Sequence, residues 1–277
     1  MINALTIDLE PWYASEFLTK YLPEEKDDQI EEAVRPILDL LDKYETKATF
    51  FVLGIVAEKH PGLIREIYRK GHEIASHAYS HKTLYELGED EFRKEVEKST
   101  RLLESITGEK PIGFRAPSFS INNSTKWALR ILEEYGFKYD SSIFPIKTML
   151  YGVPNAPLHP YRPSKGDVAR HDPDGDIIEF PMTVLKFRWN IPVAGGFWLR
   201  LLPIWFIRFA IRKINQANPA VIYIHPWETY SRTPRLSRVP LFRRVVTYYG
   251  ISSALSRLED LLEKFKFKPL CKFLEEV

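Results

Sequence analysis

Short runs of β-forming residues alternate with longer helical patterns along the first half of the chain, and this alternation limits the folds it can adopt. Strands are expected at residues 3–8, 48–53, 73–76, 112–115 and 138–140, and helices at 28–44, 62–70, 89–106 and 124–135. Strands separated by helices run parallel, with the helices packed against the sheet. The pattern therefore predicts an α/β fold, and it leaves an open doubly wound sheet and a closed barrel as alternatives.

The middle of the chain interrupts this order. Residues 144–176 carry no clear period but many chain-breaking residues, namely Gly152, Gly166, Gly175, Pro145, Pro154, Pro157, Pro160, Pro163 and Pro173. A long irregular insertion of this kind often forms the rim of a site. Order returns with a strand at 177–181, an apolar helix up to about Gln216, a strand at 220–225 and a final helix at 252–265.

Charge and cysteine content exclude several classes of function. The chain has 39 Lys and Arg against 37 Asp and Glu, so its formal net charge of +2 gives no bulk attraction to nucleic acid. Cys271 is the single cysteine, which rules out an intramolecular disulfide. Because the opening residues do not have the pattern of a secretory leader, we expect a cytoplasmic location.

The most apolar stretch is residues 197–211. It contains Arg200, Pro203 and Arg208, whereas a membrane-spanning helix needs ~20 predominantly apolar residues. We therefore expect no transmembrane segment. Packing on the core is the favoured interpretation, and a peripheral contact with a membrane surface is the alternative.

Two acids end the first predicted strand. Side chains of an extended chain repeat every second residue, so Asp8 and Glu10 share a face. The carboxyl ends of parallel strands are where α/β active sites gather. The two carboxylates are therefore candidate site residues, with solvated loop acids as the alternative.

Three histidines lie close together around the third predicted strand, one at its start and two after its end. His72 and His77 are five residues apart, which does not fit the His-Glu-x-x-His helix of zinc proteases. His77 and His81 are the better pair, because a helical turn beginning near His77 would place both imidazoles on one face and allow Zn–N bonds of ~2.0–2.1 Å. Exposed or capping histidines are the alternative. We expect His72 to be a buried structural residue.

Two further residues are candidates at strand ends. Arg115 precedes Pro117 by two residues and could pair with Asp8, although a surface ion pair is the alternative. His225 ends an apolar strand and is a candidate general acid or base, against a satisfied core histidine. Because all these segments follow predicted strands, together they predict one site.

In this order the segments resemble the polysaccharide deacetylase family, the carbohydrate esterases with the nodulation-protein deacetylase homology domain. Residues 6–10 look like the family's first motif, His77 and His81 its His-x3-His motif, Arg115 and Pro117 its Arg-x-Pro motif, Asp140 the fourth, and residues 222–225 the fifth. Residues 195–198, residues 224–228 and the final helix resemble the subgroup associated with exopolysaccharide synthesis.

The resemblance implies a fold and an activity. The fold is a distorted (β/α)7 barrel in a single domain over residues 1–277, with the barrel in 1–230 and a C-terminal extension in 231–277 that packs on it. The activity is metal-dependent removal of an N-acetyl group from an N-acetylated saccharide. Leu9 separates Asp8 from Glu10, whereas the common form of the motif has two adjacent aspartates. The spaced form is similar to that of the allantoinase-like branch, so hydrolysis of a small cyclic amide is an alternative, as is a catalytically silent saccharide-binding protein.

The resemblance also assigns roles. Glu10, His77 and His81 are implied to hold a divalent metal, with Zn²⁺ the expected ion. Asp8 is the implied catalytic base, oriented by Arg115, and His225 is the implied acid. The expected partners are the N-acetylated saccharide and no nucleic acid, and the oligomeric state is left open. The remaining expected roles are tuning of the site's charge by Asp140 and stacking on sugar rings, against core packing, by Trp12, Tyr13, Trp198 and Trp227.

Overall fold

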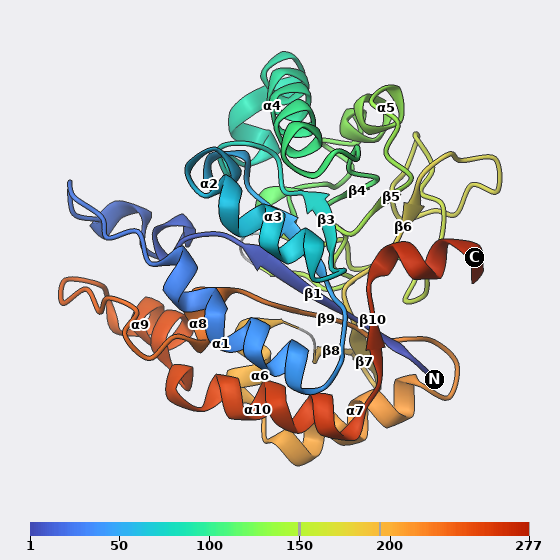
Figure 1. Ribbon diagram of the computed structural model, residues 1–277. Coiled ribbons are helices and arrows are strands. Elements are labelled where there is room, and N and C mark those ends of the chain that lie inside the picture. The colour runs from blue at the N-terminus through green and yellow to red at the C-terminus, as the bar shows by residue number, and fades with distance from the viewer. Residues whose placement is uncertain (149–150, 194, 277) are drawn as a thin grey trace.

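The computed structural model describes residues 1–148, 151–193 and 195–276, and a curved parallel sheet lies at its centre (Figure 1). β9 pairs with β1, and β1 to β6 follow one another in chain order, all parallel. The α/β barrel expected from the sequence is confirmed, in the form of a half-barrel. Its strands are β1 (Asn3–Leu9), β2 (Thr49–Val52), β3 (Glu73–Ser76), β4 (Gly113–Phe114), β5 (Tyr139–Asp140), β6 (Ile178–Glu179) and β9 (Val221–Ile224).

Helices surround this sheet. In Figure 1 the helices α2 to α5 lie above it, and α1, α6, α7 and α10 lie below. The short helices α8 (Pro226–Thr229) and α9 (Leu241–Tyr248) lie at the end of the molecule toward which β1 runs. The surrounding helices are α1 (Ile30–Lys43), α2 (Gly54–Lys59), α3 (Pro61–Arg69), α4 (Leu84–Thr107), α5 (Trp127–Glu134), α6 (Gly196–Leu201), α7 (Ile204–Ile214) and α10 (Ile251–Lys264).

The two-residue period of the strands separates an outer core from an inner one. In β1, Leu5 and Ile7 join the hydrophobic cluster formed with the helices, whereas Ala4 joins the cluster inside the barrel. In β9, Ile222 packs outward and Tyr223 inward. Polar residues in the inward register at the strand ends are therefore directed toward the mouth of the barrel.

The C-terminal segment takes part in the barrel. β10 (Phe267–Lys268) pairs with the start of β1, and η4 (Leu270–Glu276) contributes Leu270 and Phe273 to the inner cluster. The sequence predicted this segment as an extension that packs on the barrel. The strand β10 was not expected, because its partner β1 lies at the opposite end of the chain.

Other differences from the expected elements are local. The irregular insertion is confirmed, since its described part is held by isolated bridges. The single apolar helix expected up to Gln216 is two helices, because Pro203 ends one and begins the next. The antiparallel hairpin of β7 (Val184–Lys186) and β8 (Asn190–Pro192) was not predicted. Within the described residues, none of the helices combines the length and apolar character that crossing a bilayer requires.

Candidate active site

The predicted candidates from three strand ends meet in one cavity. Asp8 and Glu10 come from the end of β1, His77 follows β3 and His225 follows β9. All four line the same cavity, at the C-terminal edge of the sheet where the sequence predicted a site. Its other lining residues include His81, Glu16, Phe119, Tyr151, Phe197, Arg200, Tyr223, Trp227 and Glu228.

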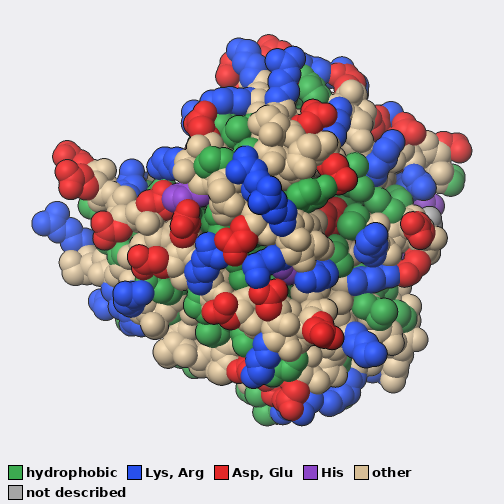
Figure 2. All heavy atoms as spheres, in the orientation of Figure 1, with side chains coloured by type: hydrophobic (Ala, Val, Ile, Leu, Met, Phe, Trp, Pro, Cys, Tyr) green, Lys and Arg blue, Asp and Glu red, His purple; other side chains and the backbone are tan. Residues whose placement is uncertain are grey.

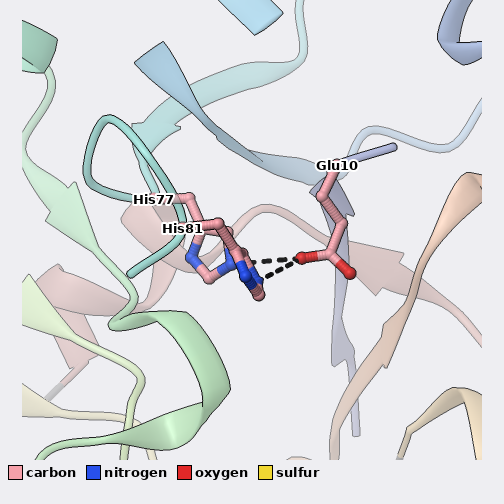
Figure 3. Close-up of side chains that lie close together, drawn as sticks. All are labelled: Glu10, His77 and His81. Carbon is pink, nitrogen blue, oxygen red and sulfur yellow. Dashed lines mark ion pairs between the residues drawn. The ribbon is translucent and has the colours of Figure 1, made fainter. Parts of the chain in front are cut away.

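Glu10, His77 and His81 form a compact cluster (Figure 3). The Oε2 atom of Glu10 lies 2.7 Å from Nε2 of His81 and 3.7 Å from Nε2 of His77. Each of the three residues offers one ligand atom, and these atoms lie within 4.8 Å of one another. A small cation can therefore be reached by two nitrogens and one carboxylate oxygen at once.

The chemistry of these donors fits a divalent cation. Nδ1 of His77 donates to the carbonyl oxygen of Arg115 at 2.7 Å, so the lone pair of this ring is on Nε2, which faces Glu10. Oε2 of Glu10 is buried, and no described residue meets it with hydrogen-bond geometry. Burial acts to raise the pKa of Glu10, but the charges of His81 and His225 outweigh it and hold the pKa well below its usual range. Two imidazoles and one carboxylate are typical zinc ligands.

The predicted helical turn at His77 is wrong. The segment from His77 to His81 is a loop, and His81 has φ +65°, a left-handed conformation that is costly for a residue with a side chain. Glu95 of α4 holds this loop, because its carboxylate accepts hydrogen bonds from the backbone N–H groups of Tyr79 and Ser80 at 2.9 and 2.8 Å. The loop, and not helical spacing, brings the two rings together.

Arg115 orients one oxygen of Asp8, and their predicted pairing is confirmed. The guanidinium is fully buried, and its Nη1 lies 2.6 Å from Oδ1 of Asp8 and 2.8 Å from Oγ1 of Thr6. Its Nε and Nη2 donate to the carbonyl and hydroxyl oxygens of Ser141 at 2.8 and 2.9 Å. The second oxygen of Asp8 lies 3.8 Å from Nε2 of His225. Asp8 is therefore fixed through one oxygen while the other faces the opposite side of the cavity.

A carboxylate and a buried arginine stand behind His225. Nδ1 of His225 lies 2.7 Å from Oε2 of Glu228, and Oε1 of Glu228 lies 2.7 Å from Nη2 of Arg200. Burial acts to lower the pKa of His225, but the charges of Glu10 and Glu228 outweigh it and raise the pKa to about 10. Burial likewise opposes ionisation of Glu228, yet Arg200 and His225 lower its pKa to about 2. The pair therefore favours a protonated imidazole.

Neither Arg200 nor Glu228 was predicted to have a role. A signal existed, because an arginine inside the apolar run 197–211 has to find a carboxylate if that run is buried. Gly196 lies directly against the carboxylate of Glu228. A Cβ at position 196 would lie 1.4 Å from Oε2 of Glu228. The close approach therefore requires glycine.

Asp140 is not one of the described residues that line the cavity. It is fully buried and accepts a hydrogen bond from Oγ of Ser142 at 2.5 Å. Burial raises its pKa to about 6, and burial together with the facing charge of Asp140 raises the pKa of Glu179 well above its usual range. Ser142 also accepts from the backbone N–H of Ala116, next to Arg115. Asp140 can therefore affect the site through these neighbours and through the interaction of its charge with Arg115.

The predicted stacking residues separate into different environments. Trp227 lines the cavity, stacks on His225 with ring centroids 5.5 Å apart, and donates from Nε1 to Oε1 of Glu10 at 3.3 Å. Trp12 is 2% exposed and packs in a core cluster that also contains Trp227, and it does not line the cavity. Trp198 lines a neighbouring groove together with Trp189. The positions favour core packing for Trp12 and contact with the cavity for Trp227.

Glu16 is a cavity residue that the sequence did not single out. Its Oε1 is buried without a hydrogen-bond partner in the described part of the chain, and burial raises its pKa. The residue lies in a loop between η1 (Trp12–Ala14) and η2 (Thr19–Tyr21). A lone acid in a short loop carries no sequence signal, so only the fold brings it to the cavity.

Two family models match consecutive parts of the chain. Residues 26–139 match the polysaccharide deacetylase family, and residues 141–275 match a domain of unknown function, DUF3473. The boundary falls directly after β5, inside the sheet, so both segments build one barrel. Arg200, His225 and Glu228 belong to the second segment, whereas His77, His81 and Arg115 belong to the first.

Known proteins are similar to parts or to the whole of this fold. The peptidoglycan-N-acetylglucosamine deacetylase of Bacillus cereus is 42% identical over 93 residues, which is 33% of this chain and 34% of that protein. The matched regions cover 34% to 51% of the full lengths of three curated relatives, the B. cereus protein among them.

Two solved structures resemble nearly the whole chain. One is a protein of Mycobacterium smegmatis assigned as a polysaccharide deacetylase, with a TM-score of 0.61 and 24% identity over 99% of this chain and 88% of that one. The other is Puue allantoinase, with a TM-score of 0.62 and 17% identity over 98% and 88% of the two chains. At these identities the likeness shows the fold alone.

Proposed function

The chain belongs to the polysaccharide deacetylase family, and from this premise we propose that it is a divalent-metal-dependent hydrolase that removes an N-acetyl group from a saccharide amine. The observation that carries the proposal is the cluster of Glu10, His77 and His81 beside two groups suited to proton transfer, Asp8 and His225. Metal-assisted hydrolysis of an amide uses this combination of a cation site, a base and an acid.

The proposed cation is Zn²⁺, held by Glu10, His77 and His81. When bound, the ion supplies a Lewis acid that polarises the acyl carbonyl and water. The donor set supports this choice, because imidazole nitrogens favour zinc over magnesium or calcium, which prefer oxygen ligands. Trp227 fixes the second oxygen of Glu10 through its indole N–H, so the carboxylate presents Oε2 to the two imidazoles.

The protein's own groups move the protons. Asp8, held through Oδ1 by Arg115, accepts a proton from the attacking water at Oδ2. His225, held protonated by Glu228, donates from Nε2 to the nitrogen of the departing amine. The bond between the acyl carbon and nitrogen breaks as the bond from water oxygen to that carbon forms, which gives acetate and a free amine.

The proposed substrate is an N-acetylated saccharide. The named activity of the B. cereus relative supports this class. Trp227, Tyr151 and Phe197 line the cavity and provide faces on which a sugar ring can lie. The exopolysaccharide subgroup and the cytoplasmic location remain predictions.

Acetate release and metal content, measured on the same preparation, test the proposal. We expect about one zinc per chain and acetate release from chitooligosaccharides, with loss of both after chelation and recovery on adding Zn²⁺. Allantoin is assayed in parallel. Hydrolysis of allantoin without acetate release would favour the cyclic-amide alternative, and saccharide binding without metal or turnover would favour a silent binding protein.

Replacing Glu228 with glutamine is expected to shift the pH dependence of kcat. Glu228 helps to raise the pKa of His225 to about 10, so its loss lowers that pKa and His225 loses its proton at lower pH. The alkaline limb of the kcat profile therefore moves to lower pH, so the loss of kcat is largest on the alkaline side of neutrality. Steady-state acetate release across the pH range measures this.

Thermal unfolding separates this effect from a structural one. Glu228→Gln leaves Arg200 buried without its ion pair, a change that typically costs ~3–5 kcal/mol. A lower Tm is therefore expected as well, but loss of folded protein alone would reduce the amplitude of the profile and leave its alkaline limb in place. Glu263→Gln, at an exposed acid of α10, is the matched control and should change neither quantity.

A further inference from the structure

The helix α9 turns its apolar face away from the core. Leu241 is 76% exposed and Phe242 60%, and Val245 and Tyr249 are also exposed. Leu241, Val245 and Tyr249 are four residues apart, so they lie on one side of successive turns. The apolar side of an amphipathic helix normally packs inward. In α9 the apolar side faces solvent. An exposed apolar surface of this kind marks an interaction site.

The same segment is strongly basic. From residue 229 to residue 258 the sequence has no Asp or Glu. Arg235, Arg238 and Arg244 are exposed and Arg243 is half-buried. Across the ranges 1–148, 151–193 and 195–276, none of these four guanidinium groups has a carboxylate within ion-pair distance.

This local excess of positive charge contrasts with the rest of the surface. Figure 2 shows acidic and basic side chains interspersed over the face it presents. Exposed cations elsewhere are commonly paired, for example Arg93 with Glu134 and Lys43 with Glu259. Since the whole chain has a formal net charge of only +2, the basic character of residues 229–258 is local.

We propose that α9 and the preceding loop dock on an anionic lipid surface, with Leu241, Phe242 and Val245 entering the headgroup region and the arginines contacting lipid phosphates. Exposed aliphatic and aromatic side chains flanked by arginines are the composition of an interfacial helix. An acidic polymer would account for the arginines but not for the outward apolar side.

The position of α9 connects this surface to the cavity. Val246 and Thr247, on the inner side of α9, line the cavity together with Phe17. Arg243 donates to the carbonyl oxygen of Phe17 at 3.4 Å, which ties α9 to the loop at the rim. Docking through α9 would therefore hold the cavity close to the lipid headgroups.

Vesicle co-sedimentation of the full chain tests the proposal. We expect binding to mixed phosphatidylglycerol and phosphatidylcholine vesicles to exceed binding to phosphatidylcholine alone by roughly 10-fold or more, and to fall with added salt. Leu241→Ser with Phe242→Ser, and separately Arg235→Gln with Arg238→Gln and Arg244→Gln, should each remove most of it. None of these residues lines the cavity, and unchanged thermal unfolding shows that the variants are folded.

Two controls make the outcome decisive. Arg93→Gln with Lys94→Gln and Arg101→Gln removes three cations from α4 and should leave binding unchanged. Trp205→Ser with Phe209→Ser removes exposed apolar side chains from α7, within the stretch that the sequence suggested for membrane contact. The proposal is overturned if anionic vesicles bind no better than neutral ones, if only the α7 variant loses binding, or if the serine pair on α9 binds like the original protein.

Discussion

Replacing Asp8 with asparagine is expected to lower kcat for deacetylation by about 10²- to 10⁴-fold while zinc content stays at that of the original protein. Asparagine keeps the shape of the side chain and still offers an oxygen to Nη1 of Arg115, which lies 2.6 Å from Oδ1 of Asp8. The amide nitrogen that replaces Oδ2 in the variant cannot accept a proton from water. Acetate release from a chitooligosaccharide, with metal analysis of the same sample, measures both quantities.

Of the two measurements, kcat and zinc content, the retained zinc content is the more informative. Asp8 is outside the cluster formed by Glu10, His77 and His81, so a variant that loses its metal would place Asp8 among the ligands and remove the separation of roles proposed here. Turnover at the original rate would eliminate Asp8 as the base. Asp39→Asn, at an exposed aspartate of α1, changes the same chemical group far from the cavity and should leave kcat and zinc unchanged.

Helices and strands could be predicted where the local sequence has a clear pattern of apolar residues. The alternation of strands and helices through β5 could be predicted because the helices have one buried face at the helical period and the strands, buried on both faces, are short β-rich runs. The residues in the inward register of β1 and β9 followed from the two-residue period of a strand. The hairpin of β7 and β8 and the strand β10 could not be predicted, because they stand outside the parallel alternation: the hairpin is antiparallel, and β10 pairs with β1 at the opposite end of the chain.

The site residues could be predicted where the residue type itself indicates a chemical role. Asp8, Glu10, His77, His81, Arg115 and His225 end or follow predicted strands, and the structure places all six at one edge. The backbone of the His77–His81 loop could not be predicted, because its two left-handed residues, Ala78 and His81, flank N–H groups that are held by Glu95 on another element. Glu16 was missed for a related reason, since only tertiary structure brings it to the cavity. Glu228, three residues after His225, was missed although the buried arginine of the apolar run called for a carboxylate partner.

Replacing His77 with alanine is expected to abolish stoichiometric zinc binding and, with it, deacetylation. Loss of a group that merely orients a ligand weakens metal affinity by ~10–100-fold, and loss of one of three direct ligands should exceed that. His77 is also the proposed ligand whose ring is fixed, through Nδ1, by the carbonyl oxygen of Arg115. Metal analysis after dialysis measures the affinity directly.

Thermal unfolding with and without zinc gives a second readout that does not depend on turnover. A ligand that binds only the folded state raises stability by an amount set by its concentration relative to Kd, about 2.7 kcal/mol at 100 times Kd. The original protein should therefore gain Tm on adding Zn²⁺, whereas His77→Ala should not. His159→Ala, at an exposed histidine of the insertion, should respond like the original protein. An equal zinc-induced rise in Tm for His77→Ala would show that the ion binds elsewhere, and the cluster would then lose its proposed role.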